Sequence, residues 1–313
     1  MNKEKHILGG LYGSLVGDAL GVPVEFAPRE ARQKDPVMGM RGGGAHGQLP
    51  GTWSDDGSLL LCAAESLVEK DGFNPQDMGE RFLQWFELGH WAARGLVFDI
   101  GIATRQALLR IRHDIPAVQA GGSGLYDNGN GSLMRILPVV LASLCLPDEI
   151  FVSRIEQASA ITHGHARSKM ACVFYGLVVR GLVRGESAAA SLVAAQEAFQ
   201  HLYADAEELG TFRTLLRKDL ASEPELHIHS GGYVMETLTA SLWCLLTTNN
   251  FSDCALKAVN LGDDTDTTGC VAGGLAGIAY GFDAIPAEWR LALPRQQELR
   301  ELITKFEQKF STL

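Results

Sequence analysis

Apolar residues recur along much of the chain with the three- and four-residue spacing of amphipathic helices, and few segments alternate with the two-residue period of a strand. This spacing predicts helices over residues 59–68, 100–109, 136–146, 169–182, 188–199, 234–246 and 299–310. Ser54 is a helix-capping residue before two acids, and Pro147-Asp148 opens a further helical run. The pattern predicts an all-α fold.

Glycine-rich segments interrupt the helical pattern at residues 41–50, 120–131 and 228–232, and they are expected to be loops. No proline- or serine-rich linker and no repeat of constant period divides the chain. Residues 1–313 are therefore expected to form one compact multi-helix domain. Loops carry function more often than the elements they join, so these segments are the first places to look for a site.

Charge narrows the classes of partner. The chain has 27 Lys and Arg against 37 Asp and Glu, a net charge of −10, which argues against a nucleic-acid binder that neutralises phosphates with basic side chains. A polyanionic ligand would have to be held by backbone amides or by metal ions. Hydrophobic residues at 46% and charged residues at 20% exclude a disordered chain or a coiled-coil rod.

The cysteines and the N-terminus bear on location. None of the 6 cysteines forms a CxxC pair, and most lie in apolar helical stretches, which is typical of reduced thiols in a cytoplasmic protein. The apolar run from Ile7 to Gly17 resembles a signal peptide, but Asp18 interrupts it. No uninterrupted apolar stretch reaches the roughly 18 residues of a membrane span. We expect a cytoplasmic protein that does not bind membranes.

Two acidic clusters stand directly before apolar helical segments. They are Ser54-Asp55-Asp56 and Asp263-Asp264-Thr265-Asp266-Thr267. Each cluster alone is explained by charged helix caps, since carboxylates are favoured at helix N-termini. Together they offer the carboxylate and hydroxyl oxygens that suit Mg²⁺ or Mn²⁺. So many carboxylates in one place repel each other unless cations lie between them, which favours a pair of divalent ions.

Small residues in the loop from Asp127 to Ser132 precede a helical segment and expose backbone amides that can hold a diphosphate, although a simple turn would look the same. The loop is neither a Walker A motif nor a Rossmann fingerprint. His163 lacks the cysteine and histidine partners of a zinc site and is interpreted as a polar contact to a ligand. Tyr233 opens a helix beside two glycines, where it could stack on a base or fill the core.

Several segments resemble the ADP-ribosylglycohydrolase family and occur in the family's order over nearly the whole chain. They include GGLYGSLVGDALGVPVEF, GTWSDDGSLLL, FDIGIATRQAL, GNGSLMRILPV, THGHARSKMA, GGYVMETLTASLW and NLGDDTDTTGCVAGGLAGIAYG. The resemblance is strongest to the bacterial branch that contains dinitrogenase reductase-activating glycohydrolase. It implies an all-α fold with a binuclear Mg²⁺ or Mn²⁺ centre in a central ADP-ribose cleft.

The resemblance also implies roles for individual residues. Metal ligands fall on Ser54, Asp55, Asp56, Asp264, Asp266 and Thr267. The phosphate loop comprises Asn128, Gly129, Asn130, Gly131 and Ser132, the ribose contact is His163 and the adenine-stacking residue is Tyr233. The candidate catalytic residues are Asp99, the mobile Glu25, and Asp56. Asp263 replaces a glycine frequent in the family, and Asp99 could instead cap the helix that begins near Gly101.

By this resemblance we expect a metal-dependent hydrolase that removes ADP-ribose from arginine in a modified protein and releases ADP-ribose. Three alternatives stay open. A structural relative such as a lens crystallin would be expected to lose metal ligands, and all six are present. An immunity protein would also bind an ADP-ribosyltransferase toxin. A related hydrolase would cleave serine-linked ADP-ribose or O-acetyl-ADP-ribose.

Overall fold

The computed structural model describes residues 3–311, and over this range the chain contains helices and no β-strand. The α-helices are α1 (Lys3–Gly21), α2 (Arg29–Lys34), α3 (Asp55–Glu69), α4 (Pro75–Leu88), α5 (Ile102–Arg112), α6 (Ala117–Ala120), α7 (Leu137–Leu141), α8 (Asp148–Ala160), α9 (Ala166–Val183), α10 (Ala188–Leu202), α11 (Val234–Leu246), α12 (Phe251–Val259), α13 (Thr265–Tyr280), α14 (Ala287–Ala292) and α15 (Gln296–Phe310). Short 3-10 helices are η1 (Val22–Val24), η2 (Glu207–Phe212), η3 (Leu220–Ser222), η4 (Glu225–His227) and η5 (Phe282–Ala284). The all-α prediction is confirmed.

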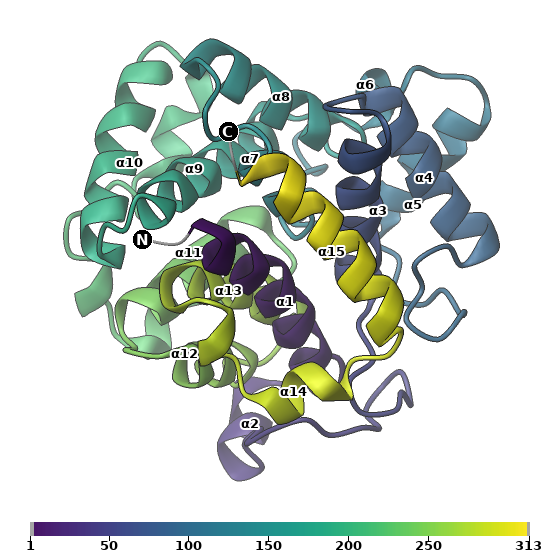
Figure 1. Ribbon diagram of the computed structural model, residues 1–313. Helices are drawn as coiled ribbons and strands as arrows, with labels where there is room; N and C mark the ends of the chain where they lie inside the picture. The colour runs from purple at the N-terminus through teal and green to yellow at the C-terminus, as the bar shows by residue number, and fades with distance from the viewer. Residues whose placement is uncertain (1–2, 312–313) are drawn as a thin grey trace.

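Helices α1 and α13 lie against each other near the middle of the molecule, as Figure 1 shows. Helices α11 and α12 pack beside α13, α9 packs on α10 and α8, and α15 lies across α1 and α3. Helices α3 to α6 form the opposite side of the ribbon from α10 and α11 (Figure 1). The first and last thirds of the chain therefore meet in the core, and this contact brings α3 close to α13.

Glycines allow the close contact between α1 and α13. Gly9, Gly13 and Gly17 are spaced by four residues on α1, and each faces backbone atoms of a glycine with the same spacing on α13. A Cβ added to Gly17 would lie 2.5 Å from the carbonyl carbon of Gly269, closer than real Cβ contacts come. Only residues without a Cβ permit this interhelical distance.

The predicted helices fall on α3, α5, α9, α10, α11 and α15, with bounds that differ by a few residues at the ends. The prediction for residues 136–146 was wrong in extent, because α7 ends at Leu141. Beyond Leu141, the backbone amide of Ser143 donates to the carbonyl of Val140, and the amide of Leu146 donates to the carbonyl of Ser143. Each bond spans three residues, so the chain continues in tighter turns than those of an α-helix. Pro147 then disfavours helical geometry at the residue before it.

Helix α1 has the length and apolar composition of a membrane-crossing helix over His6–Val24, but 94% of this stretch is buried inside the fold. Such burial is that of a core helix. Five cysteines are buried, as the apolar stretches predict, whereas Cys145 is exposed. All six are free thiols.

Candidate active site

The two acidic motifs meet because each begins a helix next to the α1–α13 contact. Ser54 is the N-cap of α3, and its hydroxyl accepts a hydrogen bond from the amide of Asp56. Asp266 and Thr267 occupy the first turn of α13. The Thr267 hydroxyl donates to Oδ2 of Asp56 at 3.3 Å, and the Ser54 hydroxyl donates to the same oxygen at 3.1 Å. A hydrogen bond therefore joins two motifs that are far apart in the sequence.

Asp18 of α1 fixes the start of α3, a role that we did not predict. Its carboxylate accepts hydrogen bonds from the amide of Ser54 at 3.0 Å and from that of Gly57 at 2.8 Å. These amides belong to the free donors of a helix N-terminus, where a carboxylate is favoured. Asp18 is fully buried, so it acts by fixing the backbone of the first acidic motif and does not face solvent.

Three carboxylate oxygens from the two motifs are buried without a hydrogen-bond partner among residues 3–311. They are Oδ1 of Asp56, Oδ1 of Asp264 and Oδ2 of Asp266. Oxygens of Glu25, Asp264 and Asp266 also lie within 4.8 Å of one another. Buried acceptors are normally paired, and anionic oxygens in a cluster are the ligands of hard divalent cations. These residues therefore fit a divalent metal site.

Burial and mutual repulsion raise the pKa of six acids here, namely Asp18, Glu25, Asp55, Asp56, Asp264 and Asp266. Burial is the largest cause for Asp18, with a pKa of about 7, and for Glu25, with a pKa of about 9, where the charges of Asp99 and Asp264 add to it. The pKa values of Asp55, Asp56 and Asp266 lie well above the usual range, and that of Asp264 is also raised. Cations between these groups would relieve both causes.

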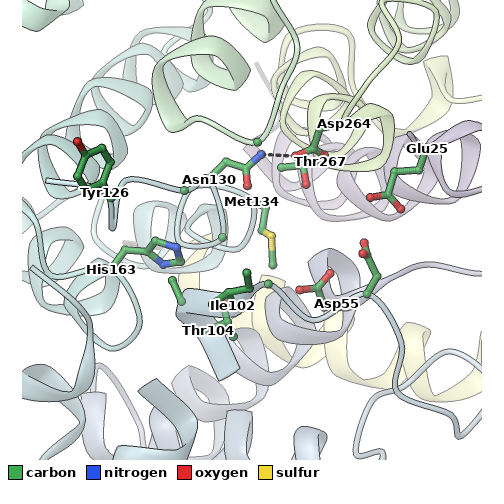
Figure 2. A pocket seen from close by; sticks show the side chains of 16 residues that line it. Glu25, Asp55, Ile102, Thr104, Tyr126, Asn130, Met134, His163, Asp264 and Thr267 are labelled. Atoms are coloured by element: carbon green, nitrogen blue, oxygen red, sulfur yellow. Dashed lines mark hydrogen bonds between the residues drawn. The ribbon is translucent and has the colours of Figure 1, made fainter. Parts of the chain in front are cut away.

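Glu25, Asp55 and Asp264 line a cavity of about 330 Å³. Figure 2 shows the carboxylates of Glu25, Asp55 and Asp264 at one end of this cavity and His163 and Tyr126 at the other. Among the predicted ligands, Asp55, Asp264 and Thr267 line the cavity, whereas Ser54, Asp56 and Asp266 are buried and do not line it. Asp263 is exposed and does not line it.

The glycine-rich loop from Asp127 to Ser132 forms another wall of the cavity. Gly129, Asn130 and Gly131 line it, and the Asn130 side-chain amide donates to Oδ2 of Asp264 at 2.8 Å (Figure 2). Asn128 lines a second cavity instead, and Ser132 is fully buried, with its hydroxyl accepting from that of Ser159. A hydrogen bond thus connects the loop directly to the second acidic motif, residues 263–267.

The second cavity, of about 470 Å³, shares Tyr126, Gly129 and Gly232 with the first. Tyr233 and Arg167 line it, and the guanidinium of Arg167 donates to the Tyr233 hydroxyl at 3.1 Å. Tyr233 is half-buried at the N-cap of α11, so an aromatic face is available beside the glycine loop. The two cavities together form one elongated space lined by acids at one end and by tyrosines at the other.

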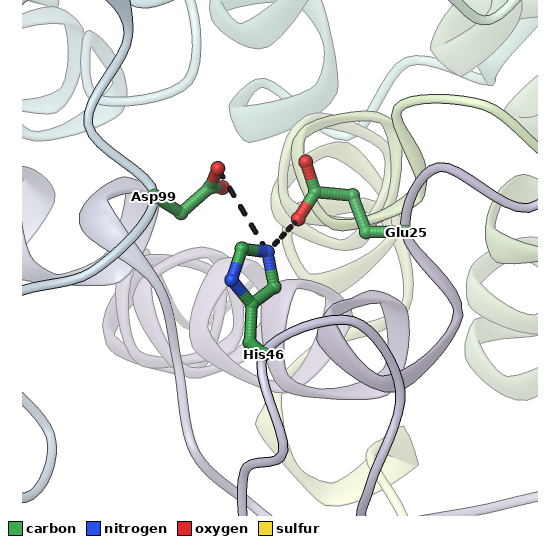
Figure 3. Close-up of side chains that lie close together, drawn as sticks. All are labelled: Glu25, His46 and Asp99. Atoms are coloured by element: carbon green, nitrogen blue, oxygen red, sulfur yellow. Dashed lines mark hydrogen bonds and ion pairs between the residues drawn. The ribbon is translucent and has the colours of Figure 1, made fainter.

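His46 is a further residue that we did not predict. Its Nε2 lies 2.5 Å from Oε2 of Glu25 and 3.9 Å from Oδ1 of Asp99, as Figure 3 shows. Its ring contacts those of Phe26 and Phe98, with centroids 5.7 and 5.1 Å away. His46 therefore lies between Glu25 and Asp99 and also contacts the aromatic residue next to each of them in the sequence. The only local signal was its place in the glycine-rich loop 41–50.

Asp99 does not cap a helix. The N-cap of α5 is Gly101, and no side chain forms a cap hydrogen bond there. Asp99 adopts a positive φ of 54°, a conformation that Asp tolerates better than most residues. It also lines the first cavity, of about 330 Å³. The capping interpretation was therefore wrong, and Asp99 is available to a ligand.

Comparisons with known proteins agree with this geometry. Residues 1–312 match the family model described as ADP-ribosylglycohydrolase. "ADP-ribosylarginine hydrolase Tri1" of Serratia proteamaculans is 33% identical over 297 residues, covering 94% of this chain and 76% of that protein. "ADP-ribosyl-[dinitrogen reductase] glycohydrolase" of Rhodospirillum rubrum is 32% identical, covering 95% and 93%. "ADP-ribosylhydrolase ARH3" of Homo sapiens is 25% identical, covering 93% and 89%.

A solved structure titled "ADP-ribosylglycohydrolase-related protein complex" superposes with a TM-score of 0.82 at 34% identity, covering 98% of this chain and 99% of that one. The likeness thus extends over nearly the whole fold. The chain therefore belongs to the ADP-ribosylglycohydrolase family and is a hydrolase that removes ADP-ribose.

Proposed function

We propose that this protein hydrolyses the N-glycosidic bond between ADP-ribose and an arginine side chain of a modified protein, with two divalent cations, Mg²⁺ or Mn²⁺. The observation that carries the proposal is the set of unpartnered, buried carboxylate oxygens on Asp56, Asp264 and Asp266. They belong to two helix starts beside a cavity whose other wall is a glycine-rich loop. Such a site pairs cation ligands with amide donors.

The metal ligands are the oxygens of the two motifs, namely Ser54, Asp55, Asp56, Asp264, Asp266 and Thr267. Divalent cations held there would supply positive charge beside the ribose hydroxyls and would make water a stronger nucleophile near neutral pH. Asp18 orients the first motif through the amides of Ser54 and Gly57.

The remaining residues orient the substrate. Amides of the loop at Gly129 and Gly131 hold the diphosphate, His163 donates to the ribose part, and Tyr233 stacks on adenine in the second cavity. This orientation places the anomeric carbon near the acids at the opposite end. Binding along the whole elongated space would fix the reacting bond, which is the main contribution of positioning to catalysis.

Arginine is the proposed leaving group because Glu25 and Asp99 lie at the acidic end of the cavity. A carboxylate is the natural bidentate partner of a guanidinium, and the Asp99 carboxylate could take a proton from the attacking water and pass it to the departing nitrogen. The name of the relative at 33% identity, an ADP-ribosylarginine hydrolase, supports this choice. A cytoplasmic location is proposed from the 6 free thiols.

The test is to incubate the protein with matched peptides ADP-ribosylated on arginine or on serine, with Mg²⁺, Mn²⁺ or a chelator, and to measure free ADP-ribose. We expect release from the arginine peptide that requires a divalent cation. A strong preference for the serine peptide would refute the proposed linkage. Full release in chelator would refute the metal requirement.

A further inference from the structure

A buried row of three polar side chains lies behind the glycine loop. Arg135, 1% exposed, donates from Nη2 to Oγ1 of Thr162 at 2.6 Å. Its Nη1 donates to the carbonyl of Ala158 at 3.2 Å, and its guanidinium carbon lies 4.6 Å from the ring centroid of Phe82. The Thr162 oxygen is in turn 2.8 Å from Nδ1 of His163. The arginine is thus fixed, and it reaches the cavity only through threonine and histidine.

The chemistry of the row sets the direction of each hydrogen bond. A guanidinium has only donors, so the Thr162 oxygen accepts from Arg135. The one hydroxyl proton of Thr162 then finds an acceptor only at Nδ1 of His163, since residues 3–311 provide no other hydrogen bond to this hydroxyl. With a proton on Nδ1, the buried hydroxyl would lose its acceptor, which is costly. Nδ1 therefore accepts, and the ring proton is on Nε2.

Electrostatics keep the imidazole neutral. His163 is 2% exposed, and burial is the main cause that lowers its pKa to about 3, with the charge of Arg135 adding to it. A second proton on Nδ1 would also face the side of the ring that Thr162 occupies. The ring is thus an uncharged donor near neutral pH.

The protonated edge of the ring faces the glycine loop. A Cβ added to Gly129 would lie 3.2 Å from Nε2 of His163, and one added to Gly131 would lie 2.9 Å from Cε1. Both glycines and His163 line the first cavity, and Nε2 of His163 has no hydrogen-bond partner within residues 3–311. A donor without an acceptor therefore lies where the loop holds its ligand.

We propose that Arg135 and Thr162 are positioning residues that hold His163 as the Nε2–H tautomer, so that it donates a hydrogen bond to an oxygen of ADP-ribose held by the glycine loop. The choice of ligand rests on the proposed function, whereas the tautomer does not. In the opposite tautomer Nε2 would present a lone pair to a ligand oxygen, and an attractive contact would become a repulsive one. The row thus decides the sign of this contact.

The tautomer can be read directly from long-range ¹H–¹⁵N correlations of the ring in ¹⁵N-labelled protein near neutral pH with Mg²⁺. The His163 signals are identified by their loss in His163→Gln. We expect the Nε2–H pattern in the wild type and in Thr162→Ser, and a mixture of tautomers in Thr162→Val. An Nδ1–H pattern or an imidazolium in the wild type overturns the proposal, and this reading needs no variant to fold.

Calorimetry with ADP-ribose tests the consequence. We expect affinity to fall about tenfold in Thr162→Val, roughly the contribution of one hydrogen bond, and to recover in Thr162→Ser. Thr247→Val is the matched control, because Thr247 also accepts from a cation, Lys257, at 2.7 Å and donates to a carbonyl at 2.7 Å, away from both cavities. It should leave affinity unchanged.

The outcomes separate the two proposals. Folded Thr162→Val with wild-type tautomer and affinity refutes the positioning role. The expected tautomer in a wild-type protein that does not bind ADP-ribose refutes the proposed ligand, and leaves the tautomer assignment standing.

Discussion

Replacing Gly17 by alanine tests whether the contact between α1 and α13 depends on missing side chains. An added Cβ would lie 2.5 Å from the carbonyl carbon of Gly269 and 3.2 Å from the amide nitrogen of Cys270. Both atoms are backbone, so no side-chain rotation can make room. The helices themselves must move apart.

The size of the effect follows from that distance. The nearest backbone atom is the carbonyl oxygen of Gly269, and ordinary Cβ contacts begin near 3.4 Å, so the helices must separate by more than about 1 Å, which forfeits at least about half of the dispersion energy of contacts across the gap. Overpacking of this kind costs about 1–3 kcal/mol, and we expect about 2–3 kcal/mol here because the obstacle is rigid. For a chain of this length, that lowers Tm by about 3–5 °C.

Gly10→Ala is the matched control on the same helix. Its Cβ would meet Cγ1 of Ile278 at 2.8 Å, a side-chain atom that can move, and alanine favours the helix by about 1 kcal/mol over glycine. Differential scanning calorimetry of both variants, with circular dichroism to confirm helix content, makes the comparison. The reasoning fails if Gly17→Ala is as stable as Gly10→Ala or more so.

Three further variants address the site. Asp56→Asn combined with Asp266→Asn, like chelation, should abolish ADP-ribose release. The circular dichroism spectrum should stay unchanged, because removing charge from the acidic cluster relieves repulsion in the fold. Full activity in chelator would contradict this expectation. Gly131→Val should weaken ADP-ribose binding at least about tenfold in calorimetry, whereas Gly210→Val, with no atom within 4 Å of its Cβ, should not; equal affinities would exclude the loop. Asp99→Asn should lower turnover of an arginine-linked peptide at least about 100-fold with unchanged ADP-ribose affinity, and near-normal turnover removes Asp99 from the mechanism.

Apolar spacing predicted the long helices α9 and α11, although most of their residues are buried, but it did not predict α1, α4 or α12. Helix α11 was predicted to the residue at both ends, and α3 from its apolar spacing and its cap at Ser54. Helix α1 contains glycines on one face and apolar residues on the others, so it has no amphipathic pattern and looked like a signal sequence. Its helical nature depends on its partner α13, which local spacing does not encode.

The acidic motifs were found because their residue types are unusual before apolar helices. Asp18 and His46 were missed because their roles arise only in three dimensions. Asp18 acts through amides of α3, and His46 acts through Glu25 and Asp99. A lone acid in an apolar run and a histidine in a glycine-rich loop carry no local signal of such partners. Proximity to the motifs in the fold is what identifies them.

The cavity of about 330 Å³ has no basic side chain in its lining. No residue that lines it is Lys or Arg; Arg167, which lines the second cavity, pairs with Glu208 at 2.8 Å, and Arg135 lies behind Thr162. Under the proposed function, ADP-ribose in a chain of net charge −10 would be held by neutral donors, such as loop amides and Nε2–H of His163, and by cations bound to the acids. The same acids that would repel the substrate in their free form would attract it once cations were bound, so the proposal predicts that binding and turnover both require metal.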